Sequence, residues 1–234
     1  MVEMENINFL EAYQKIANEV AILNKELLAE IELNPNGDLK KVYKGCQILY
    51  SPLVFNPKFM FIGINPGAGY SNYEKKYVEK YLELESHEYI THAKNIKHPI
   101  AMQTVKMMEK SNLEVLLSKS VKSNFYYFAT ANEKELKQLI DSDKKNLKLN
   151  IHLQSRNWTI ELINVIKPEI IICEGKNSFE KITKVLNANI DKTVILKNDG
   201  VNISQTGNLK IVGYHRRFSQ IKNLDKVAKY LKNL

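Results

Sequence analysis

The sequence is poor in the residues that build metal centres and disulfide frameworks. It contains 2 cysteines, Cys46 and Cys173, in 234 residues. Two thiols cannot supply the four ligands of a structural zinc site or an iron–sulfur cluster, and no group of Cys and His residues has the spacing of metal ligands. Cys173 lies in an apolar run, which is typical of a small buried hydrophobic residue. We therefore expect no metal and no cofactor.

The sequence also lacks the apolar segments of exported and membrane-spanning chains. No run approaches the roughly 20 apolar residues of a membrane-spanning helix. Residues 1–10 have neither the basic start nor the apolar stretch of a signal peptide. These absences predict a cytoplasmic protein with reduced thiols and no membrane partner.

Acidic residues are fewer than basic ones. The chain has 34 Lys and Arg against 26 Asp and Glu, a formal net charge of +8, with a pI near 9.2. A basic balance favours polyanionic partners, because each neutralised phosphate releases counterions. Heavy use of Lys, Asn and Ile, as in AT-rich genomes, explains the charge equally well. The charge alone therefore favours nucleic-acid binding only modestly.

Apolar strands alternate with helical segments along the chain. The pattern predicts strands over 58–64, 124–130, 169–174, 193–197, 201–205 and 209–214, and helices over 5–33, 100–118, 150–166, 178–186 and 224–231. This alternation indicates an α/β layered domain with a mostly parallel sheet. No repeat or linker divides the chain, so we expect a single domain over 1–234, with residues 1–36 as an N-terminal helical extension. Ligands bind beyond the carboxyl ends of parallel strands, which directs attention to the residues that follow each strand.

The first strand is followed by a segment with unusual turn chemistry. Residues 63–67 read Gly63-Ile64-Asn65-Pro66-Gly67. Glycine allows close backbone approach to a ligand, Pro66 fixes the chain direction, and Asn65 is placed to point into a cleft. The segment lacks the Gly-Lys-Ser/Thr ending of a P-loop and the spacing of a dinucleotide fingerprint. A plain strand–turn, with Asn and Pro in their usual turn roles, accounts for it equally well.

Polar side chains follow two other predicted strands. His215, Arg216 and Arg217 come after the last strand, and Thr130 and Asn132 after the second. An imidazole can donate to developing negative charge, and guanidinium groups suit phosphates. The simpler interpretations are a solvated basic loop and, for Asn132, the cap of a following helix.

The remaining histidines and the single tryptophan fit structural roles. Trp158 lies inside a helical pattern and is predicted to be in the core. The histidines show no ligand spacing and are predicted to be surface or loop residues: His87, His92, His98 and His152.

The segment 63–67 after an apolar strand resembles the first active-site motif of the mismatch-specific uracil/thymine DNA glycosylases, within the uracil-DNA glycosylase superfamily. Residues 167–175 are similar to the third core strand of that family, and 211–219 fall where its second motif lies. The resemblance implies a three-layer α/β/α domain. The second motif departs from the family pattern of His or Asn followed by Pro-Ser, because Arg216 and Arg217 follow His215 here and Ser219 comes later.

This resemblance implies a monofunctional DNA glycosylase that hydrolyses the N-glycosidic bond of a flipped uracil, or of another mispaired, damaged or modified base, and leaves an abasic site. Asn65 would position the attacking water, and His215 would stabilise the departing base. The implied base-binding residues are Gly63, Ile64, Pro66, Gly67, Tyr70, Thr130 and Asn132. The implied DNA-binding residues are Arg216, Arg217 and Ser219. The expected partner is single- or double-stranded DNA, bound by a monomer acting on the nucleoid.

Two other interpretations remain open. A glycosylase-like protein that recognises DNA or a modified base without excising it fits the altered second motif. An unrelated α/β enzyme acting on a nucleotide or a small phosphorylated substrate fits the strand-end residues.

Overall fold

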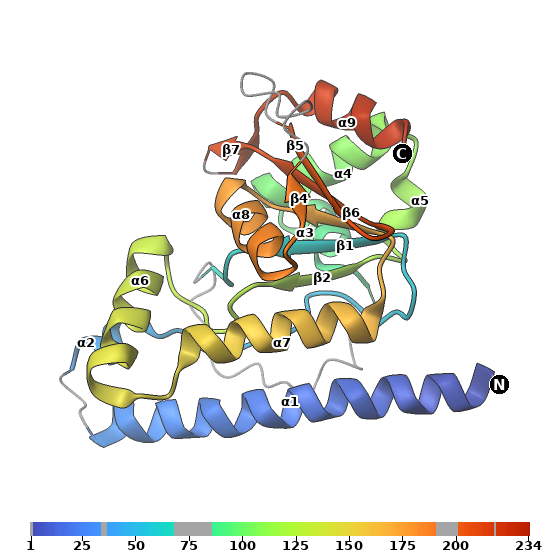
Figure 1. Cartoon of the computed structure of the whole chain (residues 1–234). Helices are drawn as coiled ribbons and strands as arrows, with labels where there is room; N and C mark the ends of the chain where they lie inside the picture. The colour runs from blue at the N-terminus through green and yellow to red at the C-terminus, as the bar shows by residue number, and fades with distance from the viewer. Residues whose placement is uncertain (1, 34–36, 68–85, 191–200, 218) are drawn as a thin grey trace. The chain divides into compact units, whose positions relative to one another are not determined.

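The computed structural model describes residues 2–33, 37–67, 86–190, 201–217 and 219–234 (Figure 1). The chain forms two compact units, and each is described by itself. Unit 1 holds the described residues among 1–48, 65–81 and 124–165. Unit 2 holds those among 49–64, 82–123 and 166–234.

Unit 1 is helical. Its elements are α1 (Val2–Leu33), α2 (Asp38–Val42), α6 (Glu133–Ser142), the π-helix η2 (Asp143–Leu147) and α7 (Ile151–Ile166). The buried residues of α1 recur every three or four positions, which places them on one face of the helix: Phe9, Tyr13, Ile16, Val20, Leu23, Leu27 and Ile31. The indole N–H of Trp158 donates to Glu19 Oε2 at 2.9 Å and so ties α7 to α1. The predicted N-terminal helix and the core position of Trp158, which is 2% exposed, are confirmed.

Asp143 starts helix α7 from a buried position. Its carboxylate accepts the backbone N–H groups of Leu149 and Ile151, both at 2.7 Å. The N–H of Ile151 is one of the unsatisfied donors that every helix N-terminus leaves, and the N–H of Leu149 lies just before the helix. The side chain therefore caps the helix from outside its first turn.

Unit 2 contains the sheet. Its strands lie in the order β2-β1-β3-β6-β5-β4, with bounds β1 Phe59–Gly63, β2 Val121–Asn124, β3 Ile170–Cys173, β4 Asn189–Ile190, β5 Val201–Thr206 and β6 Leu209–Tyr214. The β1–β3 and β3–β6 pairs are parallel, whereas β5 and β4 extend the sheet in antiparallel fashion. A short ribbon of β7 (Arg216–Arg217) and β8 (Gln220–Ile221) follows β6. The prediction of an α/β fold with a mostly parallel sheet is confirmed.

Helices cover the sheet of unit 2. The helices are α3 (Glu88–Asn95), α4 (Pro99–Lys110), α5 (Glu114–Leu117), α8 (Lys176–Val185) and α9 (Leu224–Lys232). Alternate sheet residues such as Phe59, Phe61 and Tyr214 pack against α3, α4 and α9. The alternation places Gly213 on the other face, where a Cβ at this position would lie 2.6 Å from the Phe179 ring of α8. Glycine is therefore required for α8 to pack this closely.

Two predicted elements are corrected by the structure. The aromatic run 124–130 is not a sheet strand, because β2 ends at Asn124. Tyr127 and Ala129 instead bond to Gln47, Lys44 and Gly45 of unit 1. The predicted helix over 100–118 is two helices, since Asn112 has a left-handed φ of 59° between α4 and α5. The predicted strand 193–197 lies outside the described residues.

Candidate functional site

The segment after β1 forms a corner held by Thr130. Gly63 and Ile64 are buried at the end of β1 in unit 2, and the chain continues into unit 1 at Asn65. The N–H of Thr130 donates to the Pro66 carbonyl at 3.2 Å, and Gly67 forms a parallel bridge to Thr130. Thus Asn65, Pro66, Gly67 and Thr130, all predicted site residues, lie together. We call these four residues the Asn65 corner.

Hydrogen bonding fixes the orientation of the Asn65 amide. Its Nδ2 donates to the Pro66 carbonyl at 2.9 Å and to Thr130 Oγ1 at 3.0 Å. A carbonyl can only accept, and the Thr130 hydroxyl donates its hydrogen to the Asn132 carbonyl at 2.9 Å. Both partners therefore require the amide nitrogen, so the usual ambiguity of an amide flip does not arise here. Oδ1 has no hydrogen-bond partner among the described residues and presents a half-buried acceptor.

Asn132 caps a helix. Its Oδ1 accepts the backbone N–H of Glu135 at 3.0 Å, and its Nδ2 donates to Glu135 Oε1 at 3.2 Å. Glu135 Oε2 also accepts the backbone N–H of Ala131, so the two side chains cap the start of α6 reciprocally, in a variant of the capping box. The side chain is thereby occupied, so the capping role considered from the sequence is confirmed and we do not include Asn132 in the proposed site.

The residues after β6 form a second candidate site in unit 2. His215 Nε2 lies 3.1 Å from Asn202 Nδ2. With the amide nitrogen as donor, Nε2 accepts, and a neutral imidazole then carries its proton on Nδ1. Arg216 and Arg217 are exposed in β7, and half-buried Ser219 follows in the turn to β8. The arrangement offers one imidazole N–H and two guanidinium groups to an anionic ligand.

Arg216 lies across the end of β3. A Cβ added to Gly175 would meet Arg216 Cγ and Nε at 3.8 Å. Gly175 has a φ of 121°, which L side chains rarely adopt. The space over this glycine therefore accommodates the arginine side chain.

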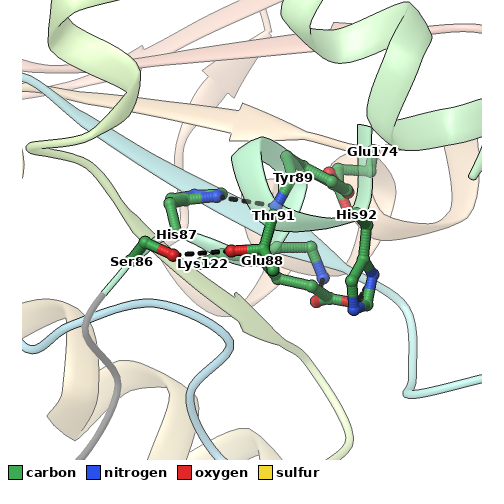
Figure 2. A network of polar contacts seen from close by, with 8 residues as sticks. All are labelled: Ser86, His87, Glu88, Tyr89, Thr91, His92, Lys122 and Glu174. Carbon is green, nitrogen blue, oxygen red and sulfur yellow. Dashed lines mark hydrogen bonds and ion pairs between the residues drawn. The ribbon is translucent and has the colours of Figure 1, made fainter. Parts of the chain in front are cut away.

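A polar network in unit 2 was missed by the sequence analysis (Figure 2). Glu174, directly after β3, is 4% exposed and accepts a hydrogen bond from the hydroxyl of Tyr89 on α3. Burial, together with the Glu174 carboxylate, raises the pKa of Tyr89 well above its usual value. Burial also raises the pKa of Tyr214, which the same carboxylate reinforces and Arg216 opposes. Both phenols therefore stay protonated at neutral pH, and Tyr89 donates its hydroxyl hydrogen to Glu174, whereas the Tyr214 hydroxyl has no hydrogen-bond partner among the described residues.

The network continues to β2 through a largely buried ion pair. Lys122 Nζ lies 3.2 Å from Glu88 Oε2 and within 5 Å of the ring centroids of Tyr50, at 4.4 Å, and Tyr89, at 4.9 Å. Glu88 Oε1 is 3.0 Å from His92 Nδ1. Burial acts to raise the pKa of Glu88, but Lys122 and His92 outweigh it and lower that pKa to about 2. The pair therefore stays ionised and links α3 to the edge of the sheet.

The prediction that His87 is a surface or loop residue is wrong, because its side chain is fully buried. Nδ1 accepts the backbone N–H of Tyr89 at 3.2 Å, which caps α3, and the ring packs edge-on against Phe61. Burial, with a further contribution from the Lys122 charge, lowers its pKa to about 3. Aromatic packing and capping offset part of the cost of burying the neutral ring, because its Nε2 has no hydrogen-bond partner among the described residues. Nothing in the sequence spacing signals this, since the partners come from separate elements.

The described residues contain no group of three or more His, Cys, Asp or Glu side chains that could hold a metal ion. Both cysteines are buried and unpaired, and burial raises the pKa of each thiol. In the part of the chain that the structure describes, no helix is both long and apolar enough to cross a membrane.

The predicted site residues are divided between the two units, and one of them lies outside the described residues. Tyr70 lies outside the described residues. The Asn65 corner belongs to unit 1 and His215 with its arginines to unit 2. Their roles in a common reaction therefore stay predictions.

Comparison with known proteins overturns the family assignment. No family model and no curated protein matches the sequence. The Haemophilus influenzae protein HI1011, of the family DUF1537, matches in structure with a TM-score of 0.33 and 12% identity. That match covers 78% of this chain but only 42% of the other, and so low a TM-score supports no conclusion about function. The prediction that the chain belongs to the uracil-DNA glycosylase superfamily is wrong, because no family model, including any of that superfamily, matches the sequence.

Proposed function

We propose that this protein hydrolyses an N-glycosidic bond in DNA, removing a flipped uracil or another mispaired, damaged or modified base and leaving an abasic site. The proposal keeps the predicted three-layer α/β/α arrangement and drops the superfamily assignment. The proposed reaction is argued from the residues of this chain alone. The observation that carries it is the fixed amide of Asn65, whose Oδ1 is left as an acceptor just beyond a buried parallel strand.

An acceptor in that position suits a water molecule. A water that donates one hydrogen to Oδ1 keeps a lone pair available for attack on carbon. A neutral amide is too weak a base to remove the proton of that water. The reaction therefore has to be dissociative: the bond between C1′ and the base nitrogen breaks first, and its electron pair leaves with the base. The water oxygen then adds to the cationic C1′ and loses its proton to solvent.

The leaving base carries negative charge, which calls for a hydrogen-bond donor. His215 offers Nδ1–H when Asn202 donates to Nε2. In that tautomer, the group that would donate to the leaving base is Nδ1–H. The net charge of +8 and the two exposed arginines of β7 support a phosphate-bearing substrate.

The proposal is tested on a panel of labelled oligonucleotides carrying uracil, hypoxanthine, thymine mispairs or modified cytosines, in single and double strands. Hot alkali converts each abasic site into a strand break. We expect breaks on at least one substrate, with the intact base released. No break on any substrate would contradict the proposal. Tight binding to a lesion without a break would instead support a recognition protein that does not excise.

A further inference from the structure

We propose that a lysine surface on unit 1 holds the phosphate backbone next to the target base. The surface consists of residues from α2, α6, η2 and the adjoining turns: Lys40, Lys41, Lys44, Lys134, Lys137, Lys144, Lys145 and Lys148. Seven of these side chains are exposed and Lys44 is half-buried. The inference rests on the proposed function for the identity of the target, but it concerns residues outside the Asn65 corner.

The lysine surface begins at the Asn65 corner. The backbone N–H of Lys44 donates to the carbonyl of Ala129 at 2.9 Å, one residue before Thr130. Helix α6 starts at the cap Asn132, whose carbonyl accepts the Thr130 hydroxyl. Helix α2 packs against α6, and α6 continues into η2, so these elements share one end of unit 1 (Figure 1). A strand whose base reached Asn65 would therefore lie beside these lysines.

The lysines of α6 face away from the core of unit 1. Lys134 and Lys137 are three residues apart and so share a face, opposite the buried residues Leu136 and Leu139. Half-buried Asp141 shares the lysine face and reduces its charge. Among the described residues, Lys144, Lys145 and Lys148 form no ion pair.

The charge is concentrated in this small part of the chain. Segments 38–44 and 133–148 hold 8 lysines and 5 acidic residues, a surplus of 8 − 5 = 3, within a total of +8. Two of the five acids point at backbone N–H groups: Glu135 accepts from Ala131, and Asp143 from Leu149 and Ile151. These two carboxylates are occupied by backbone donors, and among the described residues neither forms an ion pair with a lysine of the surface.

The length of the surface suits a short stretch of strand. The 10 residues of α6 span about 15 Å at 1.5 Å per residue. At roughly 3.4 Å per nucleotide along one strand, that length corresponds to about four or five nucleotides. Because these lysines lie on helices that begin beside the Asn65 corner, a DNA strand that reaches Asn65 is the partner we propose for them.

The test uses charge reversal in matched variants. The triple variant K134E/K144E/K145E changes three lysines of the surface. The control K119E/K229E/K232E makes the same charge change at exposed lysines of unit 2. K134Q/K144Q/K145Q removes the charges without adding acids and serves if the first variant folds poorly. The probe is unmodified DNA, with binding measured by fluorescence anisotropy from about 50 to 200 mM salt.

We expect the slope of log K against log salt to become shallower by about 2 to 3 in the K134E/K144E/K145E variant, since each lost phosphate contact removes roughly 0.7 to 0.9. The control should keep the wild-type slope. If the slope of log K against log salt is the same in wild type and in all variants, the lysine surface does not bind DNA phosphates. If the K134E/K144E/K145E variant loses binding to phosphatidylserine vesicles but binds DNA as wild type does, the proposal is overturned and the surface binds a membrane instead.

The failure of this inference is distinguishable from failure of the proposed function. If the slopes change as expected but wild type makes no abasic site, the lysine surface stands and the glycosylase proposal fails. If wild type makes abasic sites and the slopes are unchanged, the surface fails and the reaction stands.

Discussion

The orientation of the Asn65 amide depends on one buried hydroxyl. Thr130→Val keeps the shape of the side chain but removes both the acceptor for Asn65 Nδ2 and the donor to the Asn132 carbonyl. We expect it to destabilise the protein by about 1–2 kcal/mol. We also expect it to lower the rate of base release by about tenfold or more, because a misdirected amide no longer positions the water.

Thr130→Ser is the matched control, because it retains the hydroxyl. Single-turnover rates and urea unfolding of both variants separate the chemical effect from the structural one. A valine variant that turns over at the wild-type rate would contradict the role assigned to this hydroxyl.

Buried His87 makes stability depend on pH. Burial lowers its pKa from the usual 6.5 to about 3 in the folded chain, so below pH 6.5 the unfolded chain binds a proton that the folded chain does not. The free energy of unfolding is independent of this group above pH 6.5 and falls as pH decreases from 6.5 toward 3, by up to about 1.4 kcal/mol per pH unit. The lowered pKa of His98 acts in the same direction, and that of Glu88 adds to it below pH 4.5.

His87→Asn tests this dependence, because Asn is a good helix N-cap and does not titrate. Unfolding free energies measured in urea between pH 7.5 and pH 5 should decline less steeply in the variant than in wild type. At neutral pH the variant should be less stable, since it loses the ring that packs on Phe61. Identical pH slopes in the two proteins would contradict the assignment.

At the residue level, the sequence indicated the Asn65 corner but not the network of Figure 2. Asn65, Pro66 and Gly67 lie within a few residues of the end of β1, so local chemistry marks them, whereas Thr130 comes from a separate segment. Glu174 is the last residue of a predicted strand, and that position was its only signal. Its partner Tyr89, and the pair of Glu88 with Lys122, come from elements whose packing no short motif reveals.

At the level of elements, helix α6 gives a test that separates capping from base recognition. Asn132→Ala removes the cap on Glu135 N–H and should cost about 1 kcal/mol of stability. We expect base release at saturating protein to stay near the wild-type rate, since the side chain is occupied by the capping box. Asn132→Ser is the control and should recover most of the lost stability. A large loss of activity in both variants, with normal stability in the serine variant, would return Asn132 to the site.

The errors in predicting the second strand have one physical cause. The aromatic run 125–128 is fully buried, as its composition indicates, but its backbone bonds to the segment 44–47 instead of the sheet. The true strand β2 reads Val-Lys-Ser-Asn, a polar sequence with little strand propensity. Side-chain composition thus predicted burial correctly, whereas the choice of backbone partner depends on tertiary contacts.

At the level of the whole molecule, the alternation of apolar strands and helices was enough to predict an α/β fold with a mostly parallel sheet. The family assignment failed because it depended on one pentapeptide and on the order of elements, and short motifs occur often by chance. The reaction proposed here rests instead on the fixed amide of Asn65. Substitution of Asn65 therefore tests the proposed reaction most directly.

The most direct measurement is the single-turnover release of free base, detected by mass spectrometry, for wild type, Asn65→Ala and Asn157→Ala. Asn157 is an exposed residue of α7 in the same unit and is the matched control. We expect wild type and Asn157→Ala to release base at equal rates. Asn65→Ala should be slower by on the order of 10²-fold or more while binding the substrate with similar affinity. Equal rates for Asn65→Ala and wild type, or no base release by wild type, would contradict the account.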